Sequence, residues 1–463
     1  MTHVQSLQVT RALALLIVLV FVGASLGAVR TKAQEPASIR FAFWGDPSEQ
    51  TAYAKVVSGF EAAHPDIHVE IDYTPGQSDY YRKITTDFAA DEPPDVFLIN
   101  YRQFGQYAAR GVLEPVASYL GSSETLSVVN YAPVAMDAFT FRGLDQTCMP
   151  QNVSSLVVYY NVDLFTANDV RLPTAGWTWD EFVAAAEALT QDTDGDGQTD
   201  VYGVVVEPSM YRMAPFVWSA GGEITDDLAN PTTLTLDTPE ALEGLEKFIS
   251  LGVNGHDVVP SEEEVTAEED GARFMRGGAV MFLQSRREVL TLRQIENFSW
   301  DVAPLPIIDE AATVLHSDAF CMAVRAENKN AVWAFIEYAV GDEGQQILTE
   351  TGRIVPVLES VARSDVFLQG VPIENEEASP SGVEPVVEAG LPPANSEVFL
   401  DNIAVMHRLP AISTWAEVED AFNAEFDRSF YDAIDIPAAA ATATANSLDA
   451  FNRATAVDLA AGP

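Results

Sequence analysis

Two hydrophobic periodicities alternate along the first hundred residues that follow the N-terminal segment. Apolar residues at positions 39, 41 and 43 alternate with polar or small neighbours, which predicts a β-strand. The next apolar residues are three or four positions apart, which predicts an amphipathic helix that ends at His64 and Pro65. The apolar stripe of that helix consists of Tyr53, Val56, Val57 and Phe60.

The same alternation repeats before residue 101. Residues 67–73 again predict a strand, residues 80–89 a second helix, and residues 95–100 an apolar run of the kind found in buried strands. This order is typical of a parallel sheet with helices on both faces. Ligands of such sheets bind at the carboxyl ends of the strands. The candidate positions are therefore 44–46, 74–81 and 100–101.

Further elements follow in the rest of the chain. Thr178 and Glu181 form the pattern of a capping box at the start of a helix over 179–190, and Thr238 followed by Pro239 is a typical helix start. The other expected helices lie at 328–340 and from within 437–445, and a surface loop is expected at 369–396. The expected strands lie within residues 151–161, 201–206, 279–283, 300–303 and 319–324.

Composition narrows the class of protein. The chain has 463 residues, 48% hydrophobic and 20% charged, which suits two or three domains or large lobes with buried cores. Lys and Arg number 25 against 69 Asp and Glu, a formal net charge of −44. Nucleic acids and anionic lipid surfaces require a basic face, so neither is an expected partner. Two cysteines are too few for a disulfide scaffold and do not by themselves make a zinc site.

The N-terminus has the pattern of a secretory signal peptide. Residues 1–33 contain three Lys or Arg residues and no acid, with an apolar core at 12–22 followed by small residues. We therefore expect export to the periplasm or the cell exterior, with cleavage after Ala28 or Ala33. No cysteine is placed for lipid attachment. The alternative is an uncleaved anchor, because residues 12–29 reach the lower length limit of a membrane-spanning helix.

Several short segments occur in a characteristic order between residues 38 and 356. They are AFWGD at 42–46, PDVF at 94–97, GVLEP at 111–115, MPQN at 149–152, VYYNVDLF at 158–165, GGE at 221–223, GAVMF at 278–282, DVAPLP at 301–306 and TGRIVP at 351–356. In this order and spacing, the chain resembles the extracellular solute-binding proteins of ABC importers, of the maltodextrin/sugar-binding type.

The resemblance implies an α/β fold of two lobes, each a mostly parallel sheet flanked by helices, with the ligand cleft between them. Lobe 1 would comprise residues 34–149 with 319–362 returning to it. Lobe 2 would comprise residues 150–318, with 363–463 largely packing on it. Such proteins close on their ligand by hinge bending, and the closed form docks on a membrane permease.

A sugar-binding cleft needs aromatic platforms for the apolar faces of the rings and fixed polar groups for the hydroxyls. Ordinary structural roles remain the alternative, with tryptophans packed in the core, the glycine pair as a turn, and Arg353 in an ion pair. The candidate ligand-binding residues, at strand ends and where the family places its cleft, are Trp44, Asp46, Tyr80, Asn100, Tyr101, Gln151, Asn152, Trp218, Gly221, Gly222, Ser285, Arg286, Ser317, Asp318 and Arg353.

Residues 192–200, DTDGDGQTD, match the first part of an EF-hand calcium loop, with Gly197 at its invariant position. Gly203 stands where the loop would have its bidentate Glu, so another acid would have to complete the site. The alternative is an acidic Asp-Gly turn. We expect no cofactor for function and, at most, a structural Ca²⁺ ion held by Asp192, Asp194, Asp196, Gln198 and Asp200.

In the family that the chain resembles, the segments that cross between the lobes run side by side. Cys148 precedes the first crossing segment and Cys321 lies in the second. With export, the resemblance therefore implies a possible Cys148–Cys321 disulfide. The alternative is two small buried residues.

The sequence predicts a non-enzymatic, monomeric, exported component of an ABC importer that binds a carbohydrate. Because basic residues are scarce, a neutral mono- or oligosaccharide is favoured over a phosphorylated ligand. One alternative is a secreted, calcium-stabilised glycoside hydrolase, which would need two carboxylates flanking the glycosidic bond. Another is a calcium-dependent adhesion protein, which only the loop at 192–200 suggests.

Overall fold

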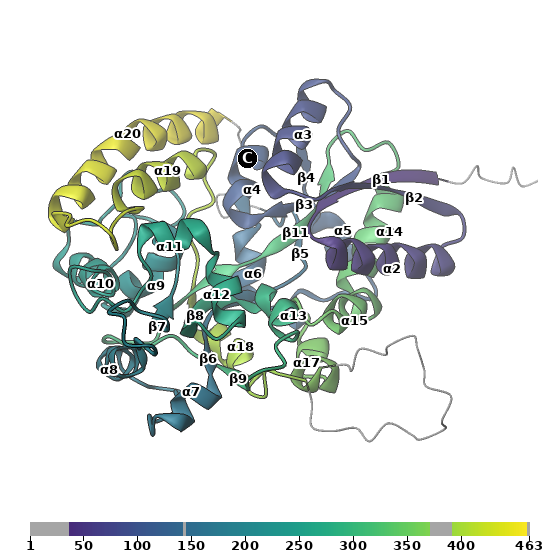
Figure 1. Cartoon of the computed structure of the whole chain (residues 1–463). Helices are drawn as coiled ribbons and strands as arrows, with labels where there is room; N and C mark the ends of the chain where they lie inside the picture. Colours follow the sequence, from purple (N-terminus) through teal and green to yellow (C-terminus); the bar gives the residue numbers. More distant parts are fainter. Residues whose placement is uncertain (1–36, 142–144, 371–390, 461–463) are drawn as a thin grey trace, which may run out of the picture.

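The computed structural model describes residues 37–141, 145–370 and 391–460. They form two lobes that lie side by side, each built on a six-stranded sheet (Figure 1). The segment expected to be a signal peptide lies outside the described residues, and so does most of the expected surface loop at 369–396. Within the described ranges, no helix is both long and apolar enough to cross a membrane.

Lobe 1 contains the sheet β2-β1-β3-β11-β4, with β5 paired to β11. As the alternating pattern predicts, β1 pairs in parallel with β2 and with β3. The helix between β1 and β2 buries the apolar stripe that its spacing indicates. The elements are β1 (Ala37–Trp44), α2 (Pro47–Ala63), β2 (Ile67–Thr74), α3 (Gln77–Ala89), β3 (Val96–Asn100), α4 (Tyr101–Ala108), β4 (Leu113–Glu114), α5 (Ala117–Ser122), α6 (Pro133–Ala138), β5 (Met149–Pro150), β11 (Asp318–Ala323), α14 (Lys329–Val340) and α15 (Asp342–Glu350).

Lobe 2 contains the sheet β12-β10-β6-β8-β7, with β9 paired to β6. Thr178 and Glu181 form the capping box expected before α8, and Thr238 caps α10 ahead of Pro239. The elements are β6 (Ser154–Asn161), α7 (Val162–Ala167), α8 (Trp179–Leu189), β7 (Tyr202–Val205), α9 (Met210–Ser219), α10 (Pro239–Ile249), α11 (Glu262–Ala267), α12 (Asp270–Met275), β8 (Ala279–Ser285), α13 (Val289–Leu292), β9 (Trp300–Ala303), β10 (Thr313–His316), α18 (Val398–Asp401) and β12 (Met406–His407).

The two-lobe α/β fold is confirmed, but both sheets are mixed rather than mostly parallel. The first residue of β11, Asp318, pairs with the last residue of β3, Asn100, and the start of β6 pairs with the end of β8. A strand that begins where its neighbour ends must run antiparallel to it. Both β6 and β11 follow a connection between the lobes, so each enters its sheet from the interlobe edge.

Three connections between the lobes, at residues 151–153, 317–318 and 352–356, lie against one another. The backbone N–H of Gln151 donates to the carbonyl of Asp318, and that of Val153 donates to the carbonyl of Val355. The disulfide joins Cys148, which comes just before the first connection, to Cys321 in β11, which comes just after the second. The disulfide implied by the resemblance is therefore present in the structure.

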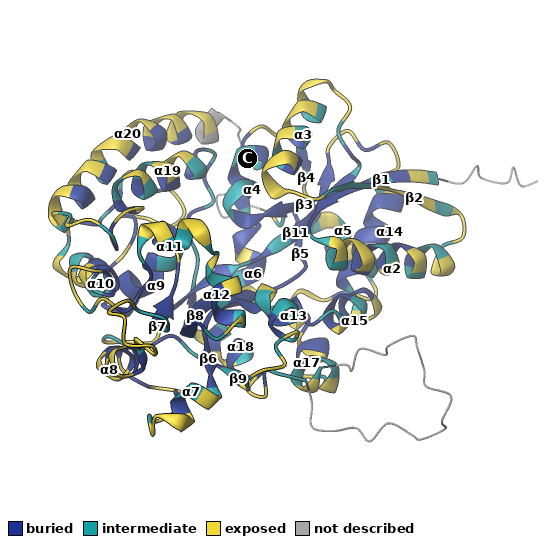
Figure 2. Cartoon of the chain, in the orientation of Figure 1, coloured by how far each residue is buried: buried dark blue, intermediate teal, exposed yellow. Residues whose placement is uncertain are grey.

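The C-terminal helices α19 (Trp415–Phe426) and α20 (Ile436–Ala460) lie along lobe 2, and α19 also packs against α4 of lobe 1 (Figure 1). Gly105 on α4 allows this approach, because a Cβ atom there would lie 2.3 Å from the carbonyl oxygen of Ile412. Figure 2 shows the central strands of both sheets buried, the edge strand β2 largely half-buried or exposed, and the outer faces of α19 and α20 exposed. Helix α19 therefore contacts both lobes, through α4 of lobe 1 and α9 of lobe 2.

Candidate functional site

Polar side chains form a hydrogen-bonded network where the connections meet. The backbone N–H of Asp318 donates to Asn152 Oδ1 at 2.8 Å, and Ser317 Oγ donates to the Asn152 carbonyl at 2.7 Å. Asn100 Nδ2 donates to Asp318 Oδ1 at 3.0 Å, while its own oxygen caps α4. This network holds the Asp318 carboxyl in a fixed position, partly exposed between the two sheets.

Gln151 belongs to the same network and is buried against lobe 1. Its Oε1 accepts from the hydroxyl of Tyr53 at 2.9 Å, and its backbone carbonyl accepts from Gln345 Nε2 at 2.9 Å. The side chain is 3% exposed. Gln151 thus fixes the first connection against α2 and α15.

The first residues of α9 bring an aromatic side chain to this network from lobe 2. Two guanidinium groups lie over the Tyr211 ring, that of Arg102 at 4.9 Å and that of Arg212 at 5.7 Å, and the His316 ring is perpendicular to it at 6.0 Å. The hydroxyls of Tyr211 and Ser209 are buried and have no hydrogen-bond partner among the described residues. Such orphaned hydroxyls favour a ligand or ordered water here, because buried polar groups are normally hydrogen-bonded.

Burial and nearby charges shift the pKa values of Asp318 and His316, two titratable groups where the connections meet. Burial raises the pKa of Asp318 to about 6, although its hydrogen bond from Asn100 acts in the opposite direction. Burial, together with the charges of Arg102 and Arg287, lowers the pKa of His316 to about 3. At neutral pH the site therefore presents a carboxylate acceptor and an uncharged imidazole.

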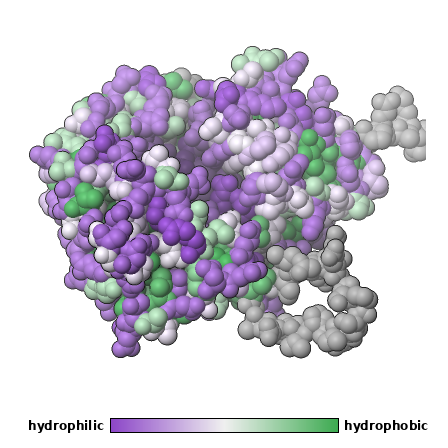
Figure 3. All heavy atoms as spheres, viewed as in Figure 1, coloured by the Kyte–Doolittle hydropathy of each residue, from purple (hydrophilic) through white to green (hydrophobic). Residues whose placement is uncertain are grey.

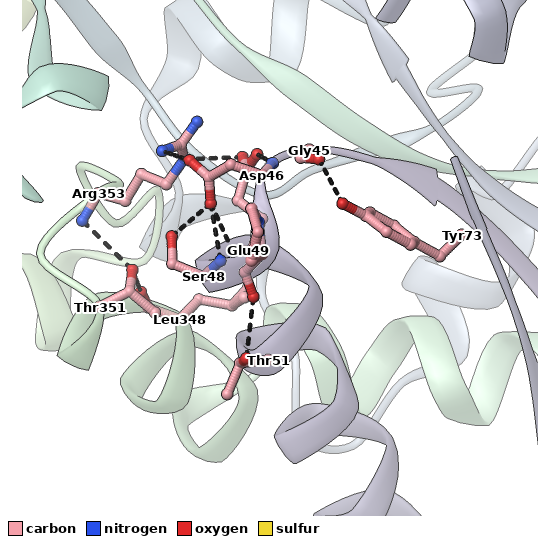
Figure 4. Close-up of polar contacts among 10 residues, drawn as sticks. Gly45, Asp46, Ser48, Glu49, Thr51, Tyr73, Leu348, Thr351 and Arg353 are labelled. Carbon is pink, nitrogen blue, oxygen red and sulfur yellow. Dashed lines mark hydrogen bonds and ion pairs between the residues drawn. The ribbon is translucent and has the colours of Figure 1, made fainter. Parts of the chain in front are cut away.

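Asp46 and Arg353 contact each other directly (Figure 4). Asp46 is the N-cap of α2 and accepts from the backbone N–H groups of Ser48 and Glu49, at 2.8 and 3.1 Å. Arg353, on the third connection, also pairs with Glu49 at 2.9 Å. Burial raises the pKa of Asp46, but the Ser48 hydroxyl and the Arg353 charge outweigh it, so the net shift is downward. This pair joins the third connection to lobe 1.

Three predicted aromatic contacts are packed inside lobe 1. Trp44 is 6% exposed and its ring lies 4.8 Å from that of Tyr80 and 5.3 Å from that of Tyr81. The Tyr80 hydroxyl donates to the Leu98 carbonyl at 2.9 Å, and Tyr101 is fully buried. Their contact with a ligand stays a prediction, and the structure gives them a packing role.

The structure does not bring Trp218, Gly221 and Gly222 to the network. Trp218 lies in the last turn of α9, the opposite end from Tyr211, and stacks on His407 at 4.8 Å. Gly221 has a positive φ of 80°, as a glycine turn requires. A Cβ on Gly222 would lie 2.7 Å from the backbone nitrogen of Ala241, so this glycine permits packing against α10.

Ser285 and Arg286 are also buried away from solvent. The backbone carbonyl of Ser285 accepts a hydrogen bond from the Tyr159 hydroxyl at 2.8 Å. Arg286 is 1% exposed, donates from Nε to the Gly352 carbonyl at 2.9 Å, and lies against the rings of Phe367 and Phe399. Burial lowers its pKa to about 9. Arg286 therefore holds the third connection in place through its hydrogen bond to Gly352.

Several charged or titratable residues around this network were not among the candidates chosen from the sequence. They come from segments that are distant from one another in the chain. Glu207 and Arg212 follow strand β7, so the rule of carboxyl strand ends could have identified them. Arg102 and Arg287 directly follow the predicted candidates Tyr101 and Arg286, whereas His316 ends β10, a strand that the pattern did not predict. Figure 3 shows that hydrophilic side chains surround the hollow near the middle of this face of the molecule.

The acidic loop at 192–200 lies apart from this network. Carboxylate oxygens of Asp192, Asp194 and Asp200 lie within 4.8 Å of one another. Asp192 accepts from the backbone N–H groups of Gly195 and Gly197, as it would in a plain turn. Asp196 instead accepts from Gln198. Calcium binding by this loop stays a prediction.

Known proteins resemble the chain over most of its length. Residues 44–346 match the family described as bacterial extracellular solute-binding protein. A maltotriose-binding protein of Pyrococcus abyssi is 23% identical over 341 residues, 72% of this chain and 69% of that protein. A diacetylchitobiose-binding protein of Streptomyces coelicolor is 22% identical over 289 residues, 60% of this chain and 64% of that protein.

Solved structures show the same fold. An ABC substrate-binding protein of Listeria monocytogenes in complex with cycloalternan is 24% identical and has a TM-score of 0.74, covering 91% of this chain and 98% of that one. A cyclic α-maltosyl-1,6-maltose-binding protein of Arthrobacter globiformis is 18% identical, with a TM-score of 0.72, and covers 90% of this chain and all of that one.

Proposed function

The chain belongs to the bacterial extracellular solute-binding protein family, and on this premise we propose that it captures a carbohydrate between its two lobes for an ABC importer. In this proposal the protein is exported, closes on the sugar by hinge bending and delivers it to a membrane permease. It catalyses no reaction. The ligands named for several relatives, maltotriose and diacetylchitobiose among them, support a carbohydrate.

The observation that carries the proposal is the set of polar groups between the lobes. The Asp318 carboxylate is fixed by Asn100 but keeps acceptor capacity, and the buried hydroxyls of Ser209 and Tyr211 are without partners among the described residues. The Tyr211 ring itself is buried beside the Arg102 and Arg212 guanidinium groups, so its unpartnered hydroxyl is the group that it offers to a ligand. A few fixed polar groups are what orient a sugar in its site.

The test is a thermal-shift screen of the purified protein against neutral mono- and oligosaccharides, followed by calorimetry and chromatography of the sugar. We expect at least one sugar to raise the melting temperature, because a ligand that binds only the folded state stabilises it. Binding should be stoichiometric and the sugar recovered unchanged.

An Asp318→Asn variant should bind that sugar more weakly, while Asp66→Asn, which alters an exposed acid of lobe 1, should bind normally. If no sugar raises the melting temperature, the carbohydrate proposal is wrong. Accumulation of a hydrolysis product would instead support the glycoside hydrolase alternative.

A further inference from the structure

The second half of helix α19 is anchored on lobe 2. Asn423 Oδ1 accepts from the backbone N–H of Met210, the first residue of α9, at 2.9 Å. Just beyond the helix, the Phe430 ring stacks on that of Phe248 in α10 at 5.0 Å, and the Phe430 carbonyl accepts from the N–H of Val253 at 3.0 Å. These contacts bind the end of α19, and the segment that follows it, to lobe 2.

The first half of the same helix is joined to lobe 1 by an ion pair. Arg102, in the first turn of α4, donates from Nη1 to both carboxylate oxygens of Glu419, at 3.2 and 3.1 Å. Glu419 is 9% exposed and also accepts from Trp415 Nε1 at 2.9 Å, so its carboxylate is held in a fixed position. Helix α19 therefore connects the two lobes, with a charged contact at its lobe 1 side.

Arg102 also lies beside the groups that the proposed function assigns to the sugar. Its backbone N–H donates to Asn100 Oδ1 at 3.2 Å, and Asn100 Nδ2 in turn donates to the Asp318 carboxylate. Its guanidinium lies over the Tyr211 ring, 4.9 Å from the ring centre. The Arg102–Glu419 pair therefore borders the interlobe network on both lobes, at Asp318 and at Tyr211.

We propose that the Arg102–Glu419 pair is an interlobe latch, which holds the lobes together around the bound sugar and slows its release. This inference rests on the proposed function. Arg102 belongs to lobe 1 and α19 is anchored on lobe 2, so hinge opening separates the two charges. Separation leaves the largely buried Glu419 carboxylate without its cation, which costs free energy. The latch therefore favours the closed arrangement without a contact to the sugar.

The experiment measures sugar release from the wild type, Arg102→Met, Glu419→Gln and the double variant. Maltotriose, diacetylchitobiose and cellotriose are titrated by calorimetry, and stopped-flow tryptophan fluorescence gives the dissociation rate of each sugar that binds. We expect each single variant to release the sugar about tenfold faster, with a smaller change in the association rate, because a charged hydrogen bond is lost from the closed form. The double variant should match the single variants, because residues that act as a pair are not additive.

Two variants and a measurement without sugar separate a latch from a purely structural role. Glu419→Gln keeps the shape of the side chain and can still accept from Trp415, so it tests the latch even where Arg102→Met fails to fold. Arg325→Met, which removes an exposed ion pair with Asp91 inside lobe 1, is the matched control and should release the sugar at the wild-type rate. Small-angle X-ray scattering of the sugar-free protein should give a larger radius of gyration for Glu419→Gln than for the wild type, because the latch populates the closed arrangement.

The outcomes separate the latch from the proposed function. A wild-type dissociation rate in Glu419→Gln would overturn the latch while leaving sugar binding intact. Additive effects of the two substitutions would also overturn it, because the two side chains would then act independently. If none of the three sugars binds, the sugar-free radius of gyration decides alone, and equal radii in Glu419→Gln and the wild type would overturn the latch.

Discussion

Replacing Asp318 by Asn tests whether the interlobe carboxylate is held at a cost to stability. Burial raises the Asp318 pKa to about 6, against an ordinary value of 3.8. A shift of one pKa unit corresponds to about 1.4 kcal/mol, so the ionised carboxylate costs the folded protein about 3 kcal/mol at neutral pH. Because the side chain is partly exposed, we expect a measured effect of about 2 kcal/mol.

The direction of the pH dependence follows from the raised pKa. Between about pH 4 and 6 the folded protein holds a proton at Asp318 that the unfolded chain has released, so the free energy of unfolding falls as pH rises. Asn is neutral at every pH and can still accept the hydrogen bond from Asn100. Asp318→Asn should therefore match the wild type near pH 3.5 and exceed it in stability at pH 8.

Urea unfolding followed by circular dichroism from pH 3.5 to 8 measures this difference. Asp66→Asn, at an exposed position, is the control and should show no such growth of the difference with pH. A stability difference between wild type and Asp318→Asn that stays constant across this range would refute the reasoning. The same variant should lose about tenfold or more in sugar affinity at pH 8, because it removes a charged hydrogen-bond acceptor.

Three further predictions concern what holds the connections together. Cys148→Ala combined with Cys321→Ala should lower the free energy of unfolding by about 2–5 kcal/mol, because the bridge closes a segment with a sequence separation of 173; equal urea midpoints for the two proteins would contradict this. Arg286→Lys should cost about 2 kcal/mol in urea unfolding, since an ammonium group cannot reproduce the planar contacts with Phe367 and Phe399. An unchanged urea midpoint would argue against this stabilising role of Arg286. Arg353→Met should cost about 1 kcal/mol at pH 7, because Asp46 is partly exposed. That loss should shrink below the lowered pKa of Asp46, and a loss that is independent of pH would exclude this ion pair as its cause.

Local periodicity and capping patterns predicted most of the strands and several of the longer helices, but most of the short helices were not predicted. The spacing of Tyr53, Val56, Val57 and Phe60 fixed the buried face of α2, and Thr178 with Glu181 fixed the start of α8. Strand direction could not be predicted in this way. The apolar run of β6 is the same for either direction, and only its entry from the interlobe edge makes it antiparallel.

The site was predicted in part, for a related reason. Asn100, Asn152, Ser317 and Asp318 were identified from strand ends and crossing segments, and the structure brings them into one network. Tyr211 was missed, although it lies in the same short helix as Trp218, which was chosen. The two residues occupy opposite ends of α9. Which end of a helix faces the other lobe depends on tertiary packing, so it cannot be predicted from the spacing of residues in the sequence.

The central claim, that the sugar binds between the lobes, is tested most directly by small-angle X-ray scattering with and without the best sugar of the screen. Hinge closure around a bound sugar predicts a smaller radius of gyration at saturation, and no such change for Asp318→Asn at the same sugar concentration. Calorimetric saturation of the wild type with an unchanged radius of gyration would contradict capture by closure of the lobes.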